Sequence, residues 1–292
     1  MGARTVEDIE CHFPSSLDEA LELLADEATR GTPMAGCTDL VVGWVSGGLS
    51  VPERAIDVSR LAELKEIDER HDRIVVGGGV TFMAMRQSSI VPRWAPALVE
   101  AAATVGGYQI QTMGTLAGSM VNASPAGDPA PTLLITDGTV VLASHRGERE
   151  VSLGKFWTGY REVDRRPDEL VVRVELPKLA EGARERFRKL GPRGAQAISK
   201  VMGAYRGKLA DDGTIEDFRV SLGSVAPTAV RLHELENWLR GQKPTPDLID
   251  EAESRASQEV EPIDDIRSTA RYRQWVSGRL VRGFLSDLTN PA

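Results

Sequence analysis

The spacing of apolar residues near the start of the chain predicts a helix followed by short segments of other structure. Ser16 and Glu19 occupy the first and fourth positions of a capping-box pattern. Apolar residues then recur at helical spacing, at Leu17, Ala20, Leu21, Leu24 and Ala28. We therefore expect a helix that begins at residue 17 and ends before Gly31, then a strand over 32–35 and a helix over the apolar run 40–45.

Further apolar runs predict a sheet with a helix between its strands. Short strands are expected over 54–58, 74–77, 150–153 and 170–176, the last of them closed by Pro177. A helix is expected over 80–94, ending near Pro92. Asp137-Gly138 lies between the apolar runs 133–135 and 140–144, and this arrangement indicates a hairpin.

A charged segment over 178–186 separates this region from the rest, and we place a domain boundary after residue 177. Beyond the boundary the pattern predicts strands over 186–190, 197–210 and 215–224, the last two joined by a turn at Asp211-Asp212-Gly213. Helices are expected around 232–239, 246–258 and 272–288. Apolar residues share one face of the last helix, at Val276, Leu280, Phe284 and Leu288, which predicts that this helix packs against a three-stranded sheet.

Composition narrows the class of function. The 292 residues carry a formal net charge of −8, which argues against a general surface for nucleic acid or anionic membranes. We find no secretory signal pattern and no membrane-spanning run, so a cytoplasmic location is expected. The two cysteines and four scattered histidines match no metal-ligand spacing, and two thiolates are too few for an iron–sulfur cluster. Redox chemistry in this chain would therefore need a bound organic cofactor.

The stretch 101–127 is the longest without an Asp, Glu, Lys or Arg, and it ends at Asp128. Its Gly, Ser, Thr, Asn and Gln residues let backbone N–H groups approach an anionic ligand closely, which indicates a large phosphorylated cofactor. Residues 36–39 also fit a phosphate loop between a strand and a helix, but taken alone this loop is better explained as an ordinary turn. Gly77-Gly78-Gly79 is not a dinucleotide fingerprint, because Phe82 occupies the position of its last glycine.

Several segments match the motifs of one family in order along the chain. Residues 34–40 read MAGCTDL and are similar to an AGGTDL loop. Residues 107–119 read GYQIQTMGTLAGS and are similar to a QIRNxxTxGGN segment, and residues 122–128 read NASPAGD and match ASPxxD. Further matching segments are 156–161, 167–170, 189–190, 197–201 and 264–273. The chain resembles the flavin-binding medium subunits of molybdenum hydroxylases, such as xanthine and carbon monoxide dehydrogenases.

This resemblance implies an α+β fold. A two-lobed, PCMH-type FAD-binding domain would span 1–177, with lobes of about 1–55 and 56–177. A smaller domain with a three-stranded antiparallel sheet and helices would span 178–292.

The resemblance also implies roles for residues in FAD binding. Two loops would cradle the pyrophosphate, Ser124 would offer a hydroxyl, and Asp128 would bind polar groups on the ribose or adenine side. Leu170 or Val171 would touch the isoalloxazine or the adenine edge, and Lys189 would reach the ring or its phosphates. The full set so implied is Met34, Ala35, Gly36, Cys37, Thr38, Asp39, Leu40, Thr115, Leu116, Ala117, Gly118, Ser119, Ser124, Asp128, Leu170, Val171 and Lys189.

Some residues depart from the family pattern. Cys37 stands where the family has Gly, which would be costly if that position needs a positive φ. Ala117 and Ser119 replace a Gly and an Asn, and Gln111-Thr112 replaces Arg-Asn, which removes a positive charge. Flavin affinity could be reduced by these changes, or the loop could have another shape, or Gln111 and Ser119 could serve instead.

The resemblance thus implies an oxidoreductase: an FAD-binding electron-transfer subunit without a catalytic side chain or metal of its own. Its partners would be a molybdenum-cofactor large subunit and an iron–sulfur small subunit, and its electron acceptor NAD or a quinone. Two alternatives keep the fold: a scaffold-like subunit with weak or lost flavin binding, and a free-standing flavin oxidoreductase. The substrate of the complex would be determined by the partner subunits.

Overall fold

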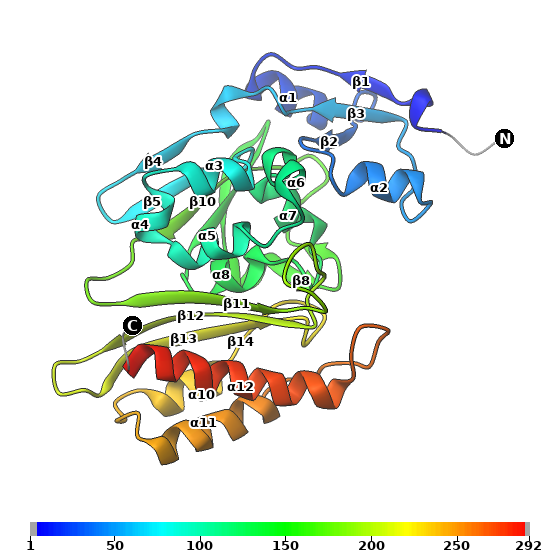
Figure 1. Cartoon of the computed structure of the whole chain (residues 1–292). Helices are drawn as coiled ribbons and strands as arrows, with labels where there is room; N and C mark the ends of the chain where they lie inside the picture. The colour runs from blue at the N-terminus through cyan, green and yellow to red at the C-terminus, as the bar shows by residue number, and fades with distance from the viewer. Residues whose placement is uncertain (1–4, 290–292) are drawn as a thin grey trace.

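The computed structural model describes residues 5–289 and stacks the chain in three parts, from the N-terminal lobe at the top of Figure 1 to the C-terminal helices at the bottom. The first part contains a short 3-10 helix η1 (Val6–Asp8) and a parallel sheet of order β1-β3-β2. Its remaining elements are β1 (Glu10–His12), α1 (Leu17–Ala25), β2 (Thr32–Met34), α2 (Leu40–Val45) and β3 (Arg54–Asp57). Between residues 5 and 289, no helix is both long and apolar enough to cross a bilayer.

Helix α1 begins as predicted but ends early. The hydroxyl of Ser16 accepts a hydrogen bond from the Glu19 N–H at 3.2 Å, which caps the first turn. The helix ends at Ala25 because Asp26 starts a turn, in which its carboxylate accepts from the N–H of Ala28 at 2.9 Å. The predicted strand over 32–35 and helix over 40–45 are confirmed as β2 and α2.

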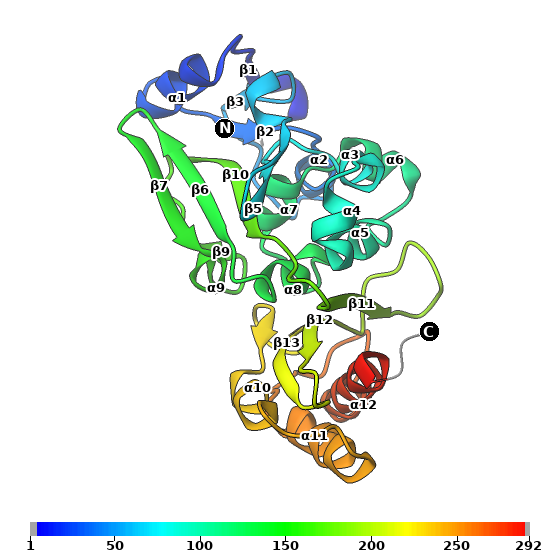
Figure 2. The ribbon, with the colours of Figure 1, turned by 90° about the vertical axis from the view of Figure 1, so that its left-hand side faces the viewer.

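The second part is built on an antiparallel sheet of order β4-β5-β10-β6-β7. Its strands are β4 (Ile67–Glu69), β5 (Arg73–Gly77), β6 (Thr139–Ser144), β7 (Gly147–Ser152) and β10 (Leu170–Pro177), and the 3-10 helix η2 (Ala62–Leu64) precedes β4. Alternate side chains of β6 point to opposite faces: Val140 and Leu142 pack with the helices of this part, whereas Val141 and Ala143 pack with α1. Figure 2 shows this sheet with most of the helices on one side.

Seven short helices and a small hairpin complete this part. They are α3 (Phe82–Gln87), α4 (Val91–Trp94), α5 (Pro96–Ala102), α6 (Tyr108–Met113), α7 (Leu116–Asn122), α8 (Pro129–Leu134), α9 (Leu153–Phe156), β8 (Trp157–Gly159) and β9 (Glu162–Val163).

Two predictions in this part are wrong. The helix expected over 80–94 is broken, because the hydroxyl of Ser88 accepts from the N–H groups of Ile90 and Val91 and starts a second helix. The run 133–135 is not a strand: it belongs to or follows helix α8, so Asp137-Gly138 leads from a helix into β6 and the hairpin lies between β6 and β7 instead.

The third part is an antiparallel sheet of order β11-β12-β13-β14 covered by three helices. The elements are β11 (Arg184–Leu190), β12 (Val201–Leu209), β13 (Ile215–Gly223), β14 (Val230–Arg231), α10 (His233–Leu239), α11 (Pro246–Gln258) and α12 (Ala270–Thr289). The two-residue strand β14 makes the predicted three-stranded sheet four-stranded. As predicted, the apolar face of α12 packs against the sheet.

Strand β12 is buried on both faces, because it joins the second and third parts. Val201 and Tyr205 pack with α12, whereas Met202 and Ala204 pack with Phe187 and with α5 of the second part. At the same interface the buried carboxylate of Glu185 accepts from the Arg206 Nε at 2.6 Å and from the N–H of Ala97 at 3.3 Å. Burial raises the pKa of Glu185, while the Arg206 guanidinium lowers it.

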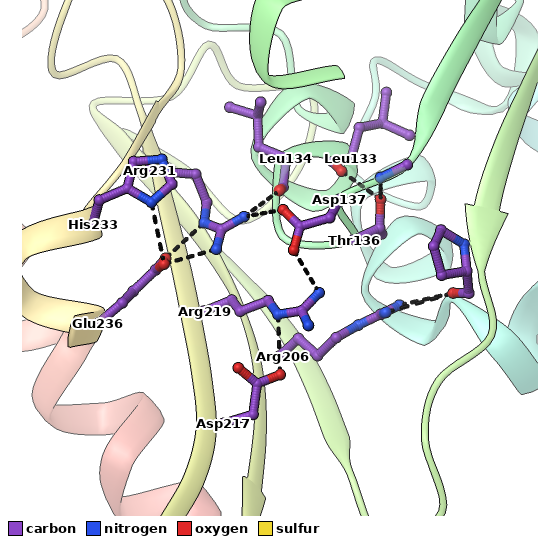
Figure 3. A network of polar contacts seen from close by, with 12 residues as sticks. Leu133, Leu134, Thr136, Asp137, Arg206, Asp217, Arg219, Arg231, His233 and Glu236 are labelled. Carbon is purple, nitrogen blue, oxygen red and sulfur yellow. Dashed lines mark hydrogen bonds and ion pairs between the residues drawn. The ribbon is translucent and has the colours of Figure 1, made fainter. Parts of the chain in front are cut away.

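A second polar network joins these parts around Arg231, as Figure 3 shows. The Arg231 guanidinium donates to both carboxylate oxygens of Glu236, at 2.6 and 2.7 Å. It also donates to the carbonyl of Leu134 at 2.9 Å and to Asp137 at 2.7 Å, both in the second part. Asp137 also pairs with Arg219 at 2.9 Å, so this residue is an ion-pair partner and not only a turn residue.

We predict that Arg231→Met destabilises the chain by about 3–5 kcal/mol, because it leaves the buried Glu236 carboxylate without its main partner. Arg219→Met is the matched control, since Arg219 is more exposed and its partners Asp137 and Asp217 are partly solvated. The control should cost no more than about 1 kcal/mol. Urea unfolding followed by tryptophan fluorescence measures both, and equal losses in the two variants would contradict the assignment.

Candidate functional site

The loop between β2 and α2 lies directly against the end of helix α6. A Cβ atom on Gly36 would be 1.8 Å from the carbonyl oxygen of Met113, closer than any side chain can approach. Only glycine therefore permits this contact between two backbones. The structure thus brings the 34–40 loop to the start of the 115–119 segment, two segments of the predicted site that are far apart in sequence.

The 34–40 loop presents unused backbone donors. Within the described part of the chain, the N–H groups of residues 36 to 40 have no hydrogen-bond acceptor. Cys37 has a φ of 56°, a left-handed conformation that favours glycine. The sequence departure at this position therefore carries a backbone cost. A row of free N–H groups at the start of a helix is suited to an anion such as a diphosphate.

The 115–119 segment does not offer the free donors that we expected. The N–H groups of Leu116 and Ala117 donate to the carbonyls of Val80 and Gly78, and that of Gly118 donates to the Thr115 hydroxyl. Ser119 N–H also donates inside the helix, to the carbonyl of Thr115. The N–H groups of residues 116–119 are therefore all used, and this part of the main chain supports the site from behind.

The three glycines at 77–79 allow the close packing by which α7 is held behind the site. A Cβ on Gly78 would lie 2.3 Å from the carbonyl oxygen of Val171 and 3.1 Å from the Ala117 Cβ. The glycines let β10 and α7 approach the same backbone, which is a packing role. The side chains of Leu170 and Val171 are 8% and 2% exposed and belong to two core clusters. The structure therefore places these two predicted ligands in the protein core.

Asp128 and Lys189 contact each other. The Lys189 Nζ donates to the Asp128 Oδ2 at 2.5 Å and to the carbonyl of Thr104 at 3.1 Å. The Thr104 hydroxyl also donates to Oδ2, at 3.0 Å. Burial raises the pKa of Asp128, and the Lys189 ammonium lowers it in opposition. Lys189 is thus used in an ion pair between the second and third parts, although we expected it at the flavin ring or its phosphates.

One oxygen of Asp128 is still available. Oδ1 is buried and has no hydrogen-bond partner among the described residues. A buried carboxylate oxygen without a donor is costly, so a ligand hydroxyl that donates to it would be stabilising. Ser124 is held nearby in the chain by a tight turn, in which its hydroxyl accepts from the N–H of Ala126 at 3.3 Å. The N–H of Ser224 donates to the Pro125 carbonyl at 2.9 Å and fixes this turn from the third part.

The remaining residues of the loop have ordinary chemistry. The Cys37 thiol donates to the Ala35 carbonyl at 3.5 Å, and its burial, together with Asp57 and Cys11, raises its pKa, so it is not an activated nucleophile. Asp39 has an exposed side chain, but partial desolvation of its carboxyl raises its pKa, an effect that Arg161 opposes. No group of metal-ligating side chains occurs within residues 5–289.

Arg161 and Asn122 were not predicted as site residues. Arg161 donates to the Asn122 Oδ1 at 2.9 Å, which ties the turn after β8 to the last residue of α7. Gln111, which we considered as a substitute for a missing arginine, is buried and bonds Arg86 and the Ala103 carbonyl instead. The sequence already singled out the segment that contains Arg161, since this segment matched the family. The match alone did not indicate what the Arg161 side chain contacts.

A surface depression of about 430 Å³ lies elsewhere, between α1 and the β6–β7 hairpin. It is lined by Leu17, Asp18, Leu21, Glu22, Ala143, Ser144, His145, Gly147 and Glu148. None of these residues belongs to the 34–40 loop or the 115–128 segment. We therefore consider the loop, and not this depression, as the candidate site.

Two family models together match most of the chain. A family model described as the FAD binding domain in molybdopterin dehydrogenase matches residues 7–179. A second model, the CO dehydrogenase flavoprotein C-terminal domain, matches residues 186–288.

Individual relatives are similar over nearly their full length. The glyceraldehyde dehydrogenase medium chain of Sulfolobus acidocaldarius is 31% identical over 263 residues, covering 89% of this chain and 91% of the relative. The structure of carbon monoxide dehydrogenase from Hydrogenophaga pseudoflava contains a chain that is 27% identical, with a TM-score of 0.90 and coverage of 97% and 96%. A chain of quinoline 2-oxidoreductase from Pseudomonas putida 86 shares the fold, with a TM-score of 0.90 at 24% identity and coverage of 99% and 98%.

The family models cover most of the chain, and the relatives are dehydrogenase subunits, among them a xanthine dehydrogenase FAD-binding subunit of Escherichia coli that is 27% identical. The cofactor of the family is FAD, and the residues at the 34–40 loop suit its diphosphate. This chain belongs to the family of FAD-binding medium subunits of molybdopterin dehydrogenases, and it is a flavoprotein subunit of a multi-subunit oxidoreductase.

Proposed function

We propose that this chain is the electron-transfer subunit of its complex and holds FAD at the junction of the 34–40 loop with α7. The observation that supports this most directly is the row of free N–H groups from residue 36 to residue 40. A diphosphate needs several donors, and these lie together at one loop. Bound FAD supplies the redox chemistry, while the chain holds and orients it.

We revise the rest of the predicted FAD site to agree with the hydrogen bonds that its residues make. The 34–40 loop, with Met34, Ala35 and Thr38 around its free donors, would bind the pyrophosphate, and the 115–119 segment would support it from behind. The free Oδ1 of Asp128 would accept from a hydroxyl of the ribose or ribityl chain, and Ser124 lies four residues earlier in the same segment. Lys189 would act through Asp128, because its ammonium group holds the other carboxylate oxygen.

We also propose the division of the chain that the sequence suggested. A FAD-binding domain would span 1–177, with lobes of about 1–55 and 56–177, and a second domain would span 178–292. The separate core clusters within 17–176 and 190–288 support two domains. The small shared cluster around Phe187 and Met202, with the ion pairs at Glu185 and Arg231, would hold them in one arrangement.

The partners follow from what the chain lacks. Its two cysteines cannot hold an iron–sulfur cluster, and no metal-ligand cluster occurs in its described residues. A large molybdenum-cofactor subunit would therefore act on the substrate, and a small iron–sulfur subunit would deliver electrons to this chain. NAD or a quinone would be the external acceptor. A scaffold without flavin is less favoured, because the free donors of the loop would then have no use.

Flavin analysis tests this function. The purified chain should carry one FAD per chain, held non-covalently, and acid denaturation should release FAD and not FMN, because the free donors suit a diphosphate. Fluorescence and chromatography of the supernatant give the amount and identity of the flavin. Release of FMN, or flavin that stays with the precipitated protein, would contradict the proposal.

Purification from the native source tests the partners. A tag on this chain should retrieve two further chains, together with molybdenum and iron measured by elemental analysis. A flavin-loaded chain that is retrieved alone and reduces an acceptor by itself would instead support a free-standing oxidoreductase.

The two loop departures should have opposite effects. Cys37→Gly should stabilise the chain by up to about 1 kcal/mol, because glycine accepts the positive φ at this position without strain. Ala117→Gly should destabilise it by about 1 kcal/mol, because residue 117 lies in helix α7. Urea unfolding of each single variant measures this, and changes of the same sign would show that the loop conformation is assigned wrongly. FAD titration should show no loss of affinity in Cys37→Gly.

A further inference from the structure

The turn between β8 and β9 places an arginine beside the candidate site. Tyr160 and Arg161 connect the two short strands, and Arg161 has a φ of 57°. A left-handed conformation is unfavourable for arginine, so its neighbours must hold the turn in place. Its guanidinium lies 5.9 Å from the centre of the Tyr160 ring, and both side chains are exposed.

The turn is fixed to the end of helix α7. The Trp157 indole donates to the Met120 carbonyl at 3.1 Å, and an Nη1 of Arg161 donates to the Asn122 amide oxygen at 2.9 Å. Met120 and Asn122 both belong to the last turn of α7. The helix therefore orients Arg161 through two contacts with the hairpin, one from Trp157 in β8 and one from Arg161 itself (β8 and α7 in Figure 1).

Through its contact with Asn122, Arg161 lies at the start of the 122–128 segment, which carries the free Oδ1 of Asp128. Its positive charge also lowers the pKa of the Asp39 carboxyl in the 34–40 loop, against the effect of desolvation. Within residues 5–289 no carboxylate is within ion-pair distance of Arg161. Most arginines of this chain are paired with an acid, whereas this one keeps donors free for a ligand.

In the segment where the family pattern has an arginine, this chain offers no cation that could bind the diphosphate. Gln111 occupies the position of the family's arginine, and its amide is turned into the protein. The Thr112 hydroxyl donates to the Gln109 carbonyl and carries no charge. A diphosphate has two negative charges, which neutral N–H groups alone compensate only in part, and a guanidinium matches its oxygens well.

We propose that Arg161, positioned by Asn122, is a direct cationic ligand of the FAD diphosphate in this chain. This inference rests on the proposed function, because it assumes that the diphosphate lies at the 34–40 loop. It adds a binding residue that the predicted set did not include, although the matching segment 156–161 ends at Arg161. Asn122 is a positioning residue, since it would act only through the Arg161 side chain.

FAD titration of the apoprotein at several salt concentrations tests the inference. Arg161→Gln should weaken FAD binding by about 10- to 100-fold, the usual size of a lost charge-assisted hydrogen bond. It should also flatten the dependence of the dissociation constant on salt, because one ionic contact is lost. Arg161→Lys should keep the salt dependence with intermediate affinity, and Asn122→Ala should weaken binding by only a few fold.

Two further variants separate binding from folding. Arg161→Gly removes the charge but suits the left-handed backbone, so it should unfold no earlier than the unmodified chain and still bind FAD weakly. Arg240→Gln is the matched control: Arg240 is an exposed arginine that follows α10 in the third part, and its loss should change neither affinity nor salt dependence.

The outcomes are distinct. Unchanged FAD affinity in Arg161→Gln and Arg161→Gly, with binding intact in the unmodified chain, would overturn this inference alone. Weaker binding with an unchanged salt dependence would also overturn it, because the residue would then be structural. Failure of the unmodified chain to bind FAD would overturn the proposed function and this inference with it.

Discussion

The close approach of Gly36 to the Met113 carbonyl is the contact on which the candidate site depends. It fixes a loop of the first part against the end of α6, and no other residue type could stand at position 36 without moving one of the two backbones. The N–H groups of residues 36–40 donate to no carbonyl within the described part of the chain. The free donors of the loop are thus a consequence of packing, and the loop does not have to rearrange to display them.

The third part of the chain completes this site from a distance. Lys189 in β11 holds the buried carboxylate of Asp128, and Ser224 holds the turn at Pro125, so the 122–128 segment is fixed by residues that follow it by more than 60 positions. These contacts depend on the domain interface, where Glu185 and Arg231 are paired in buried networks. Because a buried charge without its partner is costly, the interface has a strong preference for one geometry. A flavin site that depends on both domains would be fixed in the same way.

The sequence predicted local features well and contacts between distant segments poorly. Helical spacing and the Ser16 cap were enough for α1, and the face of Val276 and Phe284 was enough to pack α12 on its sheet. The break at Ser88 was missed because a hydroxyl competes locally with the helix. The use of the 116 and 117 N–H groups could not be foreseen, since their acceptors, Val80 and Gly78, lie 36 and 39 residues earlier in the chain. The pairing of Asp128 with Lys189 could not be predicted for the same reason, because the two residues are far apart in sequence, although both were predicted as site residues.

Hydrogen–deuterium exchange with and without FAD tests the central claim most directly, because it reports on the backbone N–H groups themselves. The free amides of residues 36–40 should exchange fast in the apoprotein and become protected when FAD is added. Amides 116–119, which are already hydrogen-bonded, should change less. Protection that appears instead at the depression between α1 and the β6–β7 hairpin, with none at 36–40, would contradict the account.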